Sequence, residues 1–367
     1  MESNYRTELI VCFEAVQAAA EISRQVLSAK DKGVLEKDDL SPVTVADFAV
    51  QALLTATLHA AFPNDKFVGE ESAADLRENP ALRERVWELA HHHAQHAGAG
   101  ASSRVRGPAS ADEMCEMIDW CGQGIPPSSG DDRVWVFDPI DGTKTFMRGE
   151  LFAINVCLIQ GGKQIVSAVG CPLLSPDAQY PVLDDSIDPS GEGSILFAVR
   201  GHGSYVRPLR GSPDEVQPRR LRELPPTASV SALRSVTCYD KVDSGSDDVH
   251  RAATEALGIE FPGCDILGWV PRWSVLALGI ASMTVWVYRK RDRYAKIWDH
   301  AGAMLLYQET GGKITDVDGK EIDLTAGRKL TANYGFVAAP ADVHAEVLRA
   351  VREALKTTGK SYLLESK

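Results

Sequence analysis

The chain has 367 residues, of which 44% are hydrophobic and 25% charged, a composition that excludes a mainly disordered, collagen-like or coiled-coil protein. Its 39 Lys and Arg against 51 Asp and Glu give a formal net charge of −12, and such a surface repels nucleic acid polymers and anionic membranes. No apolar run approaches the roughly 20 residues that cross a bilayer, and residues 1–6 precede no signal-like apolar core. We therefore expect a cytoplasmic protein, with its seven scattered cysteines as reduced thiols.

Two amphipathic helices are expected near the N-terminus. Apolar residues recur at spacings of three and four within residues 5–30, and Asp47 opens a second periodic stretch. Residues 41–44 predict a turn or a short extended stretch, because a proline disfavours helix in the residue before it. Residues 66–69 predict a short strand that leads into Glu70.

The segment from residue 73 to residue 132 is less informative. A helical patch surrounds Trp87 and runs into four histidines within residues 91–96, where a glycine-rich flank and the lack of complementary ligands argue against a metal site. Ser110 with Glu113 predicts a capping box for a helix that ends near Cys121. Residues 122–132 predict a loop.

Strand patterns return at residue 133. Residues 134–137 (VWVF) form a continuous apolar run, which is typical of a strand buried on both faces. Further apolar strands are expected at 152–159 and 165–169, with a Gly-Gly turn between them. Strands in close succession after helices predict a mixed, layered α/β structure rather than an alternating parallel one.

The second half of the chain predicts a similar mixture of elements. After an exposed loop at 175–193, the expected elements are a hairpin at 195–206, a strand near Val230, helices at 247–257 and 272–279, a strand at 284–288, a helix at 301–310, a hairpin at 313–324, a strand at 335–339 and a helix from Ala341.

Acidic residues gather where predicted strands or loops meet the starts of helices. They are Asp47, Glu70 with Glu71, Asp138 with Asp141, and Asp299. Carboxylates on such ends can converge at one edge of a sheet. Hard divalent cations prefer oxygen ligands, and Mg²⁺ is usually bound by a few carboxylates together with substrate phosphate and water.

The most informative stretch is residues 138–143 (DPIDGT). A buried strand delivers Asp138, a proline stiffens the exit, and Asp141 lies just before a helix or turn led by Gly142 and Thr143. The Ile140 carbonyl is then exposed between the two carboxylates, and the amides of Gly142 and Thr143 would bind an anion as helix N-termini do. The plainer alternative is an Asx-Pro turn with a capping aspartate.

This hexapeptide, together with residues 69–72 (GEES) and 297–302 (IWDHAG), resembles the three signatures of the inositol monophosphatase superfamily of Mg²⁺-dependent, lithium-inhibited phosphatases. The resemblance covers nearly the whole chain. Residues 144–150 (KTFMRGE) and 169–172 (VGCP) look like the 3'(2'),5'-bisphosphate nucleotidase branch, as do 41–44 (SPVT) and 198–201 (AVRG).

The resemblance implies a role for each residue that matches a family motif. The metal ligands would be Glu70, Asp138, Asp141, Asp299 and the carbonyl of Ile140, and they would hold two or three Mg²⁺ ions. Thr143 would orient the attacking water and Asp47 would accept its proton. Substrate contacts would come from Asp141, Gly142, Thr143, Arg272 and Asp299. For Asp47 and for Asp299 the alternative is a helix N-cap.

The expected nucleotide pocket departs from the family pattern. Where family members carry a serine and, three residues on, a lysine, this chain has Trp269 and Arg272, and an arginine of the following strand is replaced by Trp286. Arg272 preserves the positive charge, although arginine presents it differently from lysine. The two tryptophans would either stack on a base or pack in the core.

We therefore predict a layered αβαβα sandwich of the inositol monophosphatase and fructose-1,6-bisphosphatase type. Its two lobes would be residues 1–172, with most metal ligands, and 173–367, with Asp299 and the substrate contacts. The expected reaction converts adenosine 3',5'-bisphosphate to AMP and phosphate, with the sulfated analogue (PAPS) as a further substrate and with inhibition by lithium. The alternatives are an inositol phosphate or specialised-metabolite phosphatase and a catalytically silent binding protein. A monomer or weak dimer is expected.

Overall fold

A computed structural model of the chain describes residues 4–29, 32–36, 42–97, 103–126, 132–212 and 216–364. Its α-helices are α1 (Arg6–Ser28), α2 (Val45–Ala61), α3 (Ala74–Glu78), α4 (Pro80–Ala97), α5 (Ala111–Gly122), α6 (Thr143–Arg148), α7 (Asp247–Ala256), α8 (Trp269–Ala277), α9 (Ala301–Gln308) and α10 (His344–Thr357). Its strands are β1 (Leu35–Glu36), β2 (Pro42–Val43), β3 (Lys66–Gly69), β4 (Arg133–Asp141), β5 (Ala153–Gln160), β6 (Lys163–Cys171), β7 (Ser194–Val199), β8 (Ser204–Pro208), β9 (Arg219–Arg220), β10 (Val236–Thr237), β11 (Cys264–Asp265), β12 (Thr284–Trp286), β13 (Gly312–Thr315) and β14 (Phe336–Pro340).

A seven-stranded sheet in the order β3-β4-β5-β6-β7-β8-β9 forms the centre of the molecule. β3 pairs with β4 in parallel, and the other neighbours are antiparallel. Alternate side chains of β4 enter two different hydrophobic cores. Trp135 and Phe137 pack on one face of the sheet, whereas Val134 and Val136 pack on the other. Burial on both faces explains why this strand is apolar throughout.

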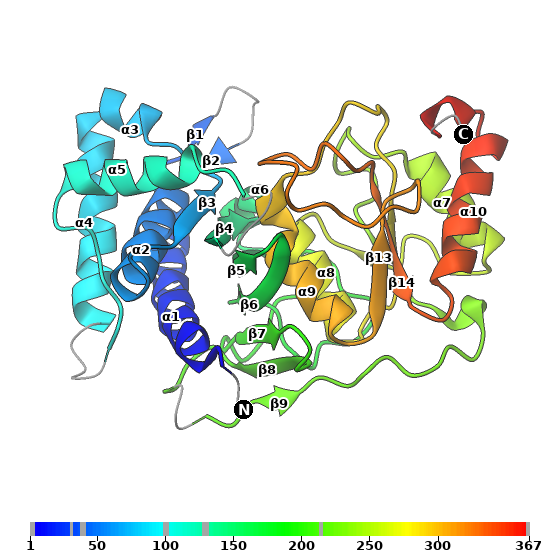
Figure 1. Cartoon of the computed structure of the whole chain (residues 1–367), viewed down its shortest axis with the longest axis horizontal. Coiled ribbons are helices and arrows are strands. Elements are labelled where there is room, and N and C mark those ends of the chain that lie inside the picture. Colours follow the sequence, from blue (N-terminus) through cyan, green and yellow to red (C-terminus); the bar gives the residue numbers. More distant parts are fainter. Residues whose placement is uncertain are drawn as a thin grey trace.

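Helices cover both faces of the central sheet (Figure 1). On one face α1 packs against β6 and α2 against β4, and on the other α8 packs against β5 and α9 against β6. Beyond α9 lies a second sheet in the order β12-β14-β13, and α10 packs against β14 on its outer side. This alternation of helical and sheet layers confirms the predicted αβαβα sandwich.

Most predicted elements are confirmed. The two N-terminal helices and the strands around the Gly-Gly turn occur as expected. Of the predicted capping box, the Ser110 side chain accepts the Glu113 amide, but the Glu113 side chain accepts the amide of Ala109 rather than that of Ser110. All seven cysteines are free and buried. Of the extended stretch at 41–44, residue 41 lies outside the described residues, and so do parts of the predicted loops at 98–102 and 127–131.

Some predictions about local structure were wrong. Residues 230–232 form a 3-10 turn, and the strand follows at β10. Residues 313–324 do not form a hairpin, because β13 pairs with β14 instead. The carboxylate of Asp316 accepts the Lys320 amide, and the side chain of Asn333 accepts the Asp323 amide. Those bonds hold the returning segment as a loop.

The four histidines within residues 91–96 lie on α4, a regular helix that runs further than expected. Within the described part of the chain, they belong to no group of side chains placed to bind a metal ion. None of the described helices combines the length and hydropathy needed to span a membrane. The lobe boundary at residue 172 stays a prediction, and β6 and β7, on its two sides, pair in one sheet.

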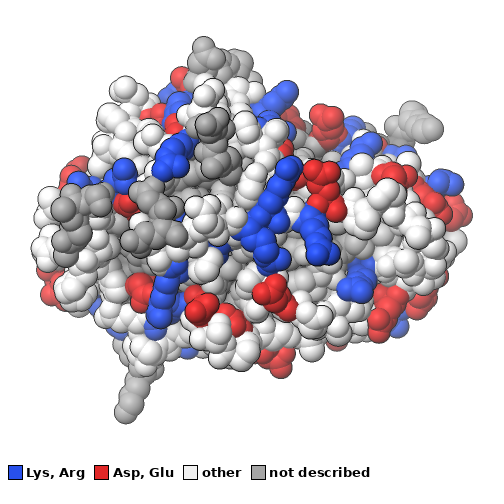
Figure 2. All heavy atoms as spheres, turned by 90° about the horizontal axis from the view of Figure 1, so that it is seen from below, with Lys and Arg blue, Asp and Glu red and all other residues white. Residues whose placement is uncertain are grey.

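Acidic and basic side chains are interspersed on the face of the molecule that Figure 2 shows. On this face neither sign of charge forms a single continuous patch.

Candidate active site

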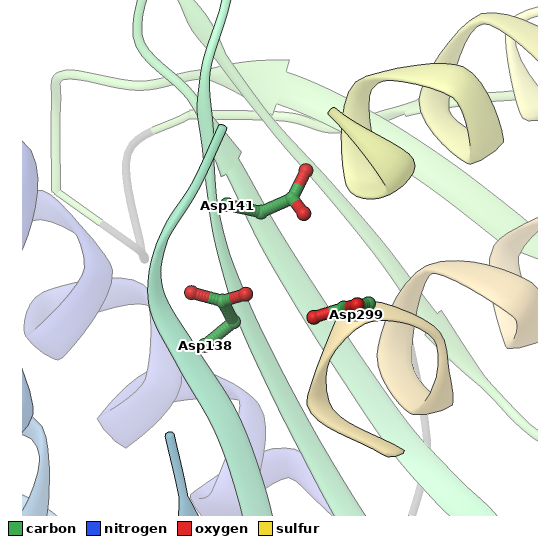
Figure 3. Close-up of side chains that lie close together, drawn as sticks. All are labelled: Asp138, Asp141 and Asp299. Atoms are coloured by element: carbon green, nitrogen blue, oxygen red, sulfur yellow. The ribbon is translucent and has the colours of Figure 1, made fainter. Parts of the chain in front are cut away.

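Three carboxylates converge where β4 ends beside the start of α9. Asp138 and Asp141 come from β4, and Asp299 comes from a 3-10 turn (Ile297–Asp299) that precedes α9. One carboxylate oxygen from each lies within 4.8 Å of the others. In Figure 3 the three side chains point toward a common space between the strand and the turn. Asp141 and Asp299 are 158 positions apart in the sequence (299 − 141), and the fold brings their side chains together.

An irregularity at the end of β4 aims both of its aspartates at this space. The register against β5 shifts between Asp138 and Asp141, as happens where a bulge redirects a side chain. The Asp138 carboxylate accepts the Ile140 amide at 3.0 Å. Gly142 then adopts φ +91°, and a Cβ there would lie 2.6 Å from Oγ1 of Thr145. Only glycine fits this close turn without strain.

The Asp141 carboxylate lies at the N-terminus of α8. Its Oδ2 accepts the amide of Val270 at 2.8 Å, and the positive end of the helix dipole favours a negative charge there. Burial nevertheless raises the pKa of Asp141 to about 7, even though the Val270 amide and the Arg272 charge act in the opposite direction. The buried carboxylate thus lacks enough positive charge around it to stay fully ionised at neutral pH.

Burial and mutual repulsion act on the other two carboxylates as well. The pKa of Asp138 is raised by burial first and then by the charges of Glu70 and Asp141. The pKa of Asp299 is raised by burial and by the charges of Asp141 and Glu70. A divalent cation would relieve this repulsion, and carboxylate oxygens are its preferred ligands. The donor set therefore fits a hard metal ion, and it is the one such group of three or more within the described residues.

Glu70 follows the carboxyl end of β3, next to β4 in the sheet, and is not among the three carboxylates within 4.8 Å, but its charge raises the pKa values of all three. The loop after β3 is held from α2, where the side chain of Gln51 donates to the Glu71 carbonyl at 2.8 Å and accepts the Glu71 amide at 2.9 Å. Gln51 is fully buried. The sequence pattern does not predict these hydrogen bonds from Gln51, although Gln51 lies about one helical turn after Asp47 on the same helix.

Thr143 and Asp47 form a second unit beside the carboxylates. The Thr143 hydroxyl lies 3.4 Å from Oδ1 of Asp47 and 3.2 Å from the Ile140 carbonyl oxygen. The other oxygen of Asp47 accepts both the amide and the hydroxyl of Thr44 at 2.7 Å. Asp47 is therefore buried, ionisable and held in place, with one oxygen directed toward Thr143.

The helix N-cap alternatives are resolved by the same contacts. The N-cap of α2 is Thr44, and Asp47 is the third helical residue, where it completes a capping box while also contacting Thr143. The N-cap of α9 is His300, and Asp299 caps no helix there. Both aspartates thus have side chains directed at the site rather than serving as N-caps.

Arg272 lies behind the carboxylates in an aromatic box. It is 2% exposed, and its guanidinium carbon lies 3.5 Å from the ring centroid of Trp269 and 4.9 Å from that of Trp286. Nε and Nη2 donate to the carbonyls of Gly268 and Leu267. Its buried Nη1 has no hydrogen-bond partner among the described residues. Trp286, at 1% exposed, packs in the core, whereas Trp269 is half-buried.

Comparisons with known proteins identify the family and the fold. The sequence pattern of the inositol monophosphatase family matches residues 4–356. A 3'(2'),5'-bisphosphate nucleotidase from Emericella nidulans is 34% identical over 360 residues, 96% of this chain and 99% of its own length. One from Schizosaccharomyces pombe is 35% identical, over 95% of each chain.

Solved structures show the same fold at lower identity. An IMPase from Thermotoga maritima superposes with a TM-score of 0.59 at 18% identity, covering 96% of this chain and 99% of its own. An inositol monophosphatase from Anabaena (Nostoc) sp. PCC 7120 gives a TM-score of 0.56 at 17% identity, covering 96% and 97%. The chain belongs to the inositol monophosphatase family.

Proposed function

We propose that the protein is a Mg²⁺-dependent phosphomonoester hydrolase whose preferred substrate is adenosine 3',5'-bisphosphate, which it converts to AMP and phosphate. The observation that carries the proposal is the cluster of three carboxylates within 4.8 Å of one another. The substrate follows from the relatives, which are named 3'(2'),5'-bisphosphate nucleotidases and match over nearly their whole length. The intact carboxylate cluster argues against a silent binding protein.

The metal site would use Asp138, Asp141, Asp299 and Glu70 together with the carbonyl of Ile140. We propose that it holds two or three Mg²⁺ ions. When bound, Mg²⁺ lowers the pKa of a coordinated water and neutralises phosphate charge. Asp138 and Asp141 are supplied by one strand, so their spacing is fixed by the backbone of β4.

Thr143 and Asp47 would handle the proton of the attacking water. In this proposal the Thr143 hydroxyl accepts a hydrogen bond from the water and donates its own hydrogen to Asp47, the group 3.4 Å away. Asp47 then takes up the proton as the water oxygen attacks phosphorus in line with the leaving oxygen. The Thr44 bonds to the other oxygen of Asp47 keep the carboxylate oriented.

Substrate contacts would come from residues around the carboxylates. We propose that the phosphate lies against the backbone of Gly142 and Thr143, beside Asp141 and Asp299. Arg272 would offer its buried Nη1, which has no other partner among the described residues, to a negatively charged group of the substrate. Inhibition by lithium, a cytoplasmic location and a monomer or weak dimer stay predictions of the sequence.

One observation favours a different substrate on the same metal site. Trp286 is buried and Arg272 is covered by two tryptophan rings, so the region expected to hold a base differs from the family pattern. An inositol phosphate or a specialised-metabolite phosphate is therefore the second candidate.

A panel of substrates separates the two. Phosphate release should be measured from adenosine 3',5'-bisphosphate, PAPS and inositol 1-phosphate at equal concentrations, with Mg²⁺ and with EDTA. We expect the adenosine bisphosphate to give the largest kcat/KM and EDTA to abolish release. Asp138→Asn is the matched control for the metal site, because the asparagine amide keeps the size of the side chain and removes the charge of a proposed metal ligand. If adenosine 3',5'-bisphosphate is among the poorest substrates, the nucleotidase proposal is refuted and the second candidate is favoured.

A further inference from the structure

Arg328 contacts the segment that carries Glu70. Its Nη2 donates to the carbonyl of Gly69 at 2.7 Å, across 259 positions of sequence, and its Nη1 donates to the carbonyl of Cys121 at 2.7 Å. Gly69 is the last residue of β3 and directly precedes Glu70. A side chain at Gly69 would collide with Gln51 and Cys121, so the carbonyl that Arg328 binds belongs to a tightly enclosed backbone.

The same residue also holds the segment that carries Asp299. The backbone carbonyl of Arg328 accepts the amide of Ile297 at 3.0 Å. Its guanidinium carbon lies 4.6 Å from the ring centroid of Trp298, the residue directly before Asp299. The carbonyl of Trp298 is in turn fixed by the side-chain amide of Asn155 on β5, at 2.6 Å. Arg328 therefore supports Asp299 through its own main chain and through the Trp298 ring.

The contacts depend on the shape of a guanidinium group. Arginine presents several N–H donors in one rigid plane, which lets it bind two carbonyls while its face stacks on an aromatic ring. The ammonium group of lysine is a compact point charge and cannot make all of these contacts in one geometry. Arg328 does not belong to the carboxylate cluster, and its side-chain hydrogen bonds go to main-chain carbonyls.

We propose that Arg328 is a positioning residue that sets the distance between Glu70 and Asp299 and thereby the affinity of the site for divalent metal ions. This inference rests on the proposed metal site. Residues that orient metal ligands typically contribute a factor of about 10 to 100 in metal affinity. If the segment that carries Glu70 shifts relative to the segment that carries Asp299, metal binding would weaken even though all the carboxylates are still present.

The test measures metal binding directly. Mn²⁺ is titrated calorimetrically into metal-free protein, for the wild type and for Arg328→Lys and Arg328→Ala. We expect Arg328→Lys to bind Mn²⁺ about tenfold more weakly and Arg328→Ala at least as weakly as that. In the activity assay the Mg²⁺ concentration for half-maximal rate should rise by a similar factor, whereas KM for substrate at saturating Mg²⁺ should not change.

Arg291 offers a matched control. Its guanidinium carbon lies 4.4 Å from the ring centroid of Tyr334, and Nη1 donates to the carbonyl of Leu363 at 3.0 Å. Like Arg328, it combines an aromatic ring with a main-chain carbonyl, but it also pairs with the carboxylate of Asp318 at 2.8 Å, and these contacts do not involve the segments that carry Glu70 and Asp299. Arg291→Lys should lower the melting temperature as Arg328→Lys does, and should leave Mn²⁺ affinity unchanged.

The possible results separate this inference from the proposed function. A wild-type protein that binds no Mn²⁺ would refute the proposed metal site and the inference with it. Wild-type Mn²⁺ affinity in a folded Arg328→Lys protein would refute the inference alone and leave Arg328 as a structural contact. If neither Arg328 variant folds, Trp298→Leu removes the ring under the guanidinium, and unchanged Mn²⁺ affinity in that protein would equally overturn the proposal.

Discussion

Asp141→Asn should make the metal-free protein more stable while it abolishes activity. Burial raises the pKa of Asp141 from 3.8 to about 7, so the folded state holds its proton more tightly than the unfolded state does. Stability is therefore present in full at low pH and falls as the pH rises from about 4 to about 7. Asparagine carries no charge, and its side-chain oxygen can still accept the Val270 amide.

The size of the effect follows from the shift. About three pKa units correspond to about 4 kcal/mol at pH 7.5 and to about 2 kcal/mol at pH 5. An unfolding entropy of about 2 cal/mol/K per residue gives roughly 0.8 kcal/mol/K for 367 residues, so about 4 kcal/mol raises the melting temperature by about 5 °C.

The assay is thermal unfolding in EDTA at both pH values, followed by addition of Mg²⁺. Asp188→Asn is the control. Burial by itself would raise the pKa of Asp188, but the hydrogen bonds that its carboxylate accepts from Gly193 and Ser190 outweigh burial and lower that pKa. This variant should be destabilised at pH 7.5. If Asp141→Asn in EDTA is no more stable than the wild type at pH 7.5, with no difference between the two pH values, the repulsion inferred among the carboxylates is refuted.

The remaining predictions concern the turn after β4 and the ion it would bind. Thr143→Val should lower kcat by about 10² to 10⁴ with unchanged Mn²⁺ binding, while Thr143→Ser keeps most activity; equal rates for both would exclude the proton role. Gly142→Ala should cost about 1–3 kcal/mol in urea unfolding, because φ is +91° and the new Cβ would meet Oγ1 of Thr145; wild-type stability would contradict this. Lithium should inhibit phosphate release, and full activity in high lithium would place the protein outside the sensitive branch.

Local patterns were sufficient for the elements that carry the site. The apolar run before Asp138 predicts a strand buried on both faces, and β4 is such a strand. The glycine after Asp141 predicts a tight turn, and Gly142 has a positive φ. In both cases the residues that determine the structure are neighbours in sequence, so periodicity and turn chemistry are informative.

Features set by distant contacts escaped prediction. The hairpin expected at 313–324 was wrong because β14, more than ten residues further on, pairs with β13. The support that Arg328 gives to Gly69 spans 259 positions, and no spacing rule links them. Likewise, the sequence identifies Arg272 as a positive charge for substrate but does not reveal that its guanidinium group lies against the rings of Trp269 and Trp286.

The most direct test of the metal centre is a crystal structure of the protein with Mn²⁺, located by anomalous scattering. The account predicts ions within about 2 Å of oxygens from Asp138, Asp141 and Asp299, with Glu70 and the Ile140 carbonyl completing the ligands. Crystals grown with millimolar Mn²⁺ that show no anomalous density between these carboxylates would contradict it.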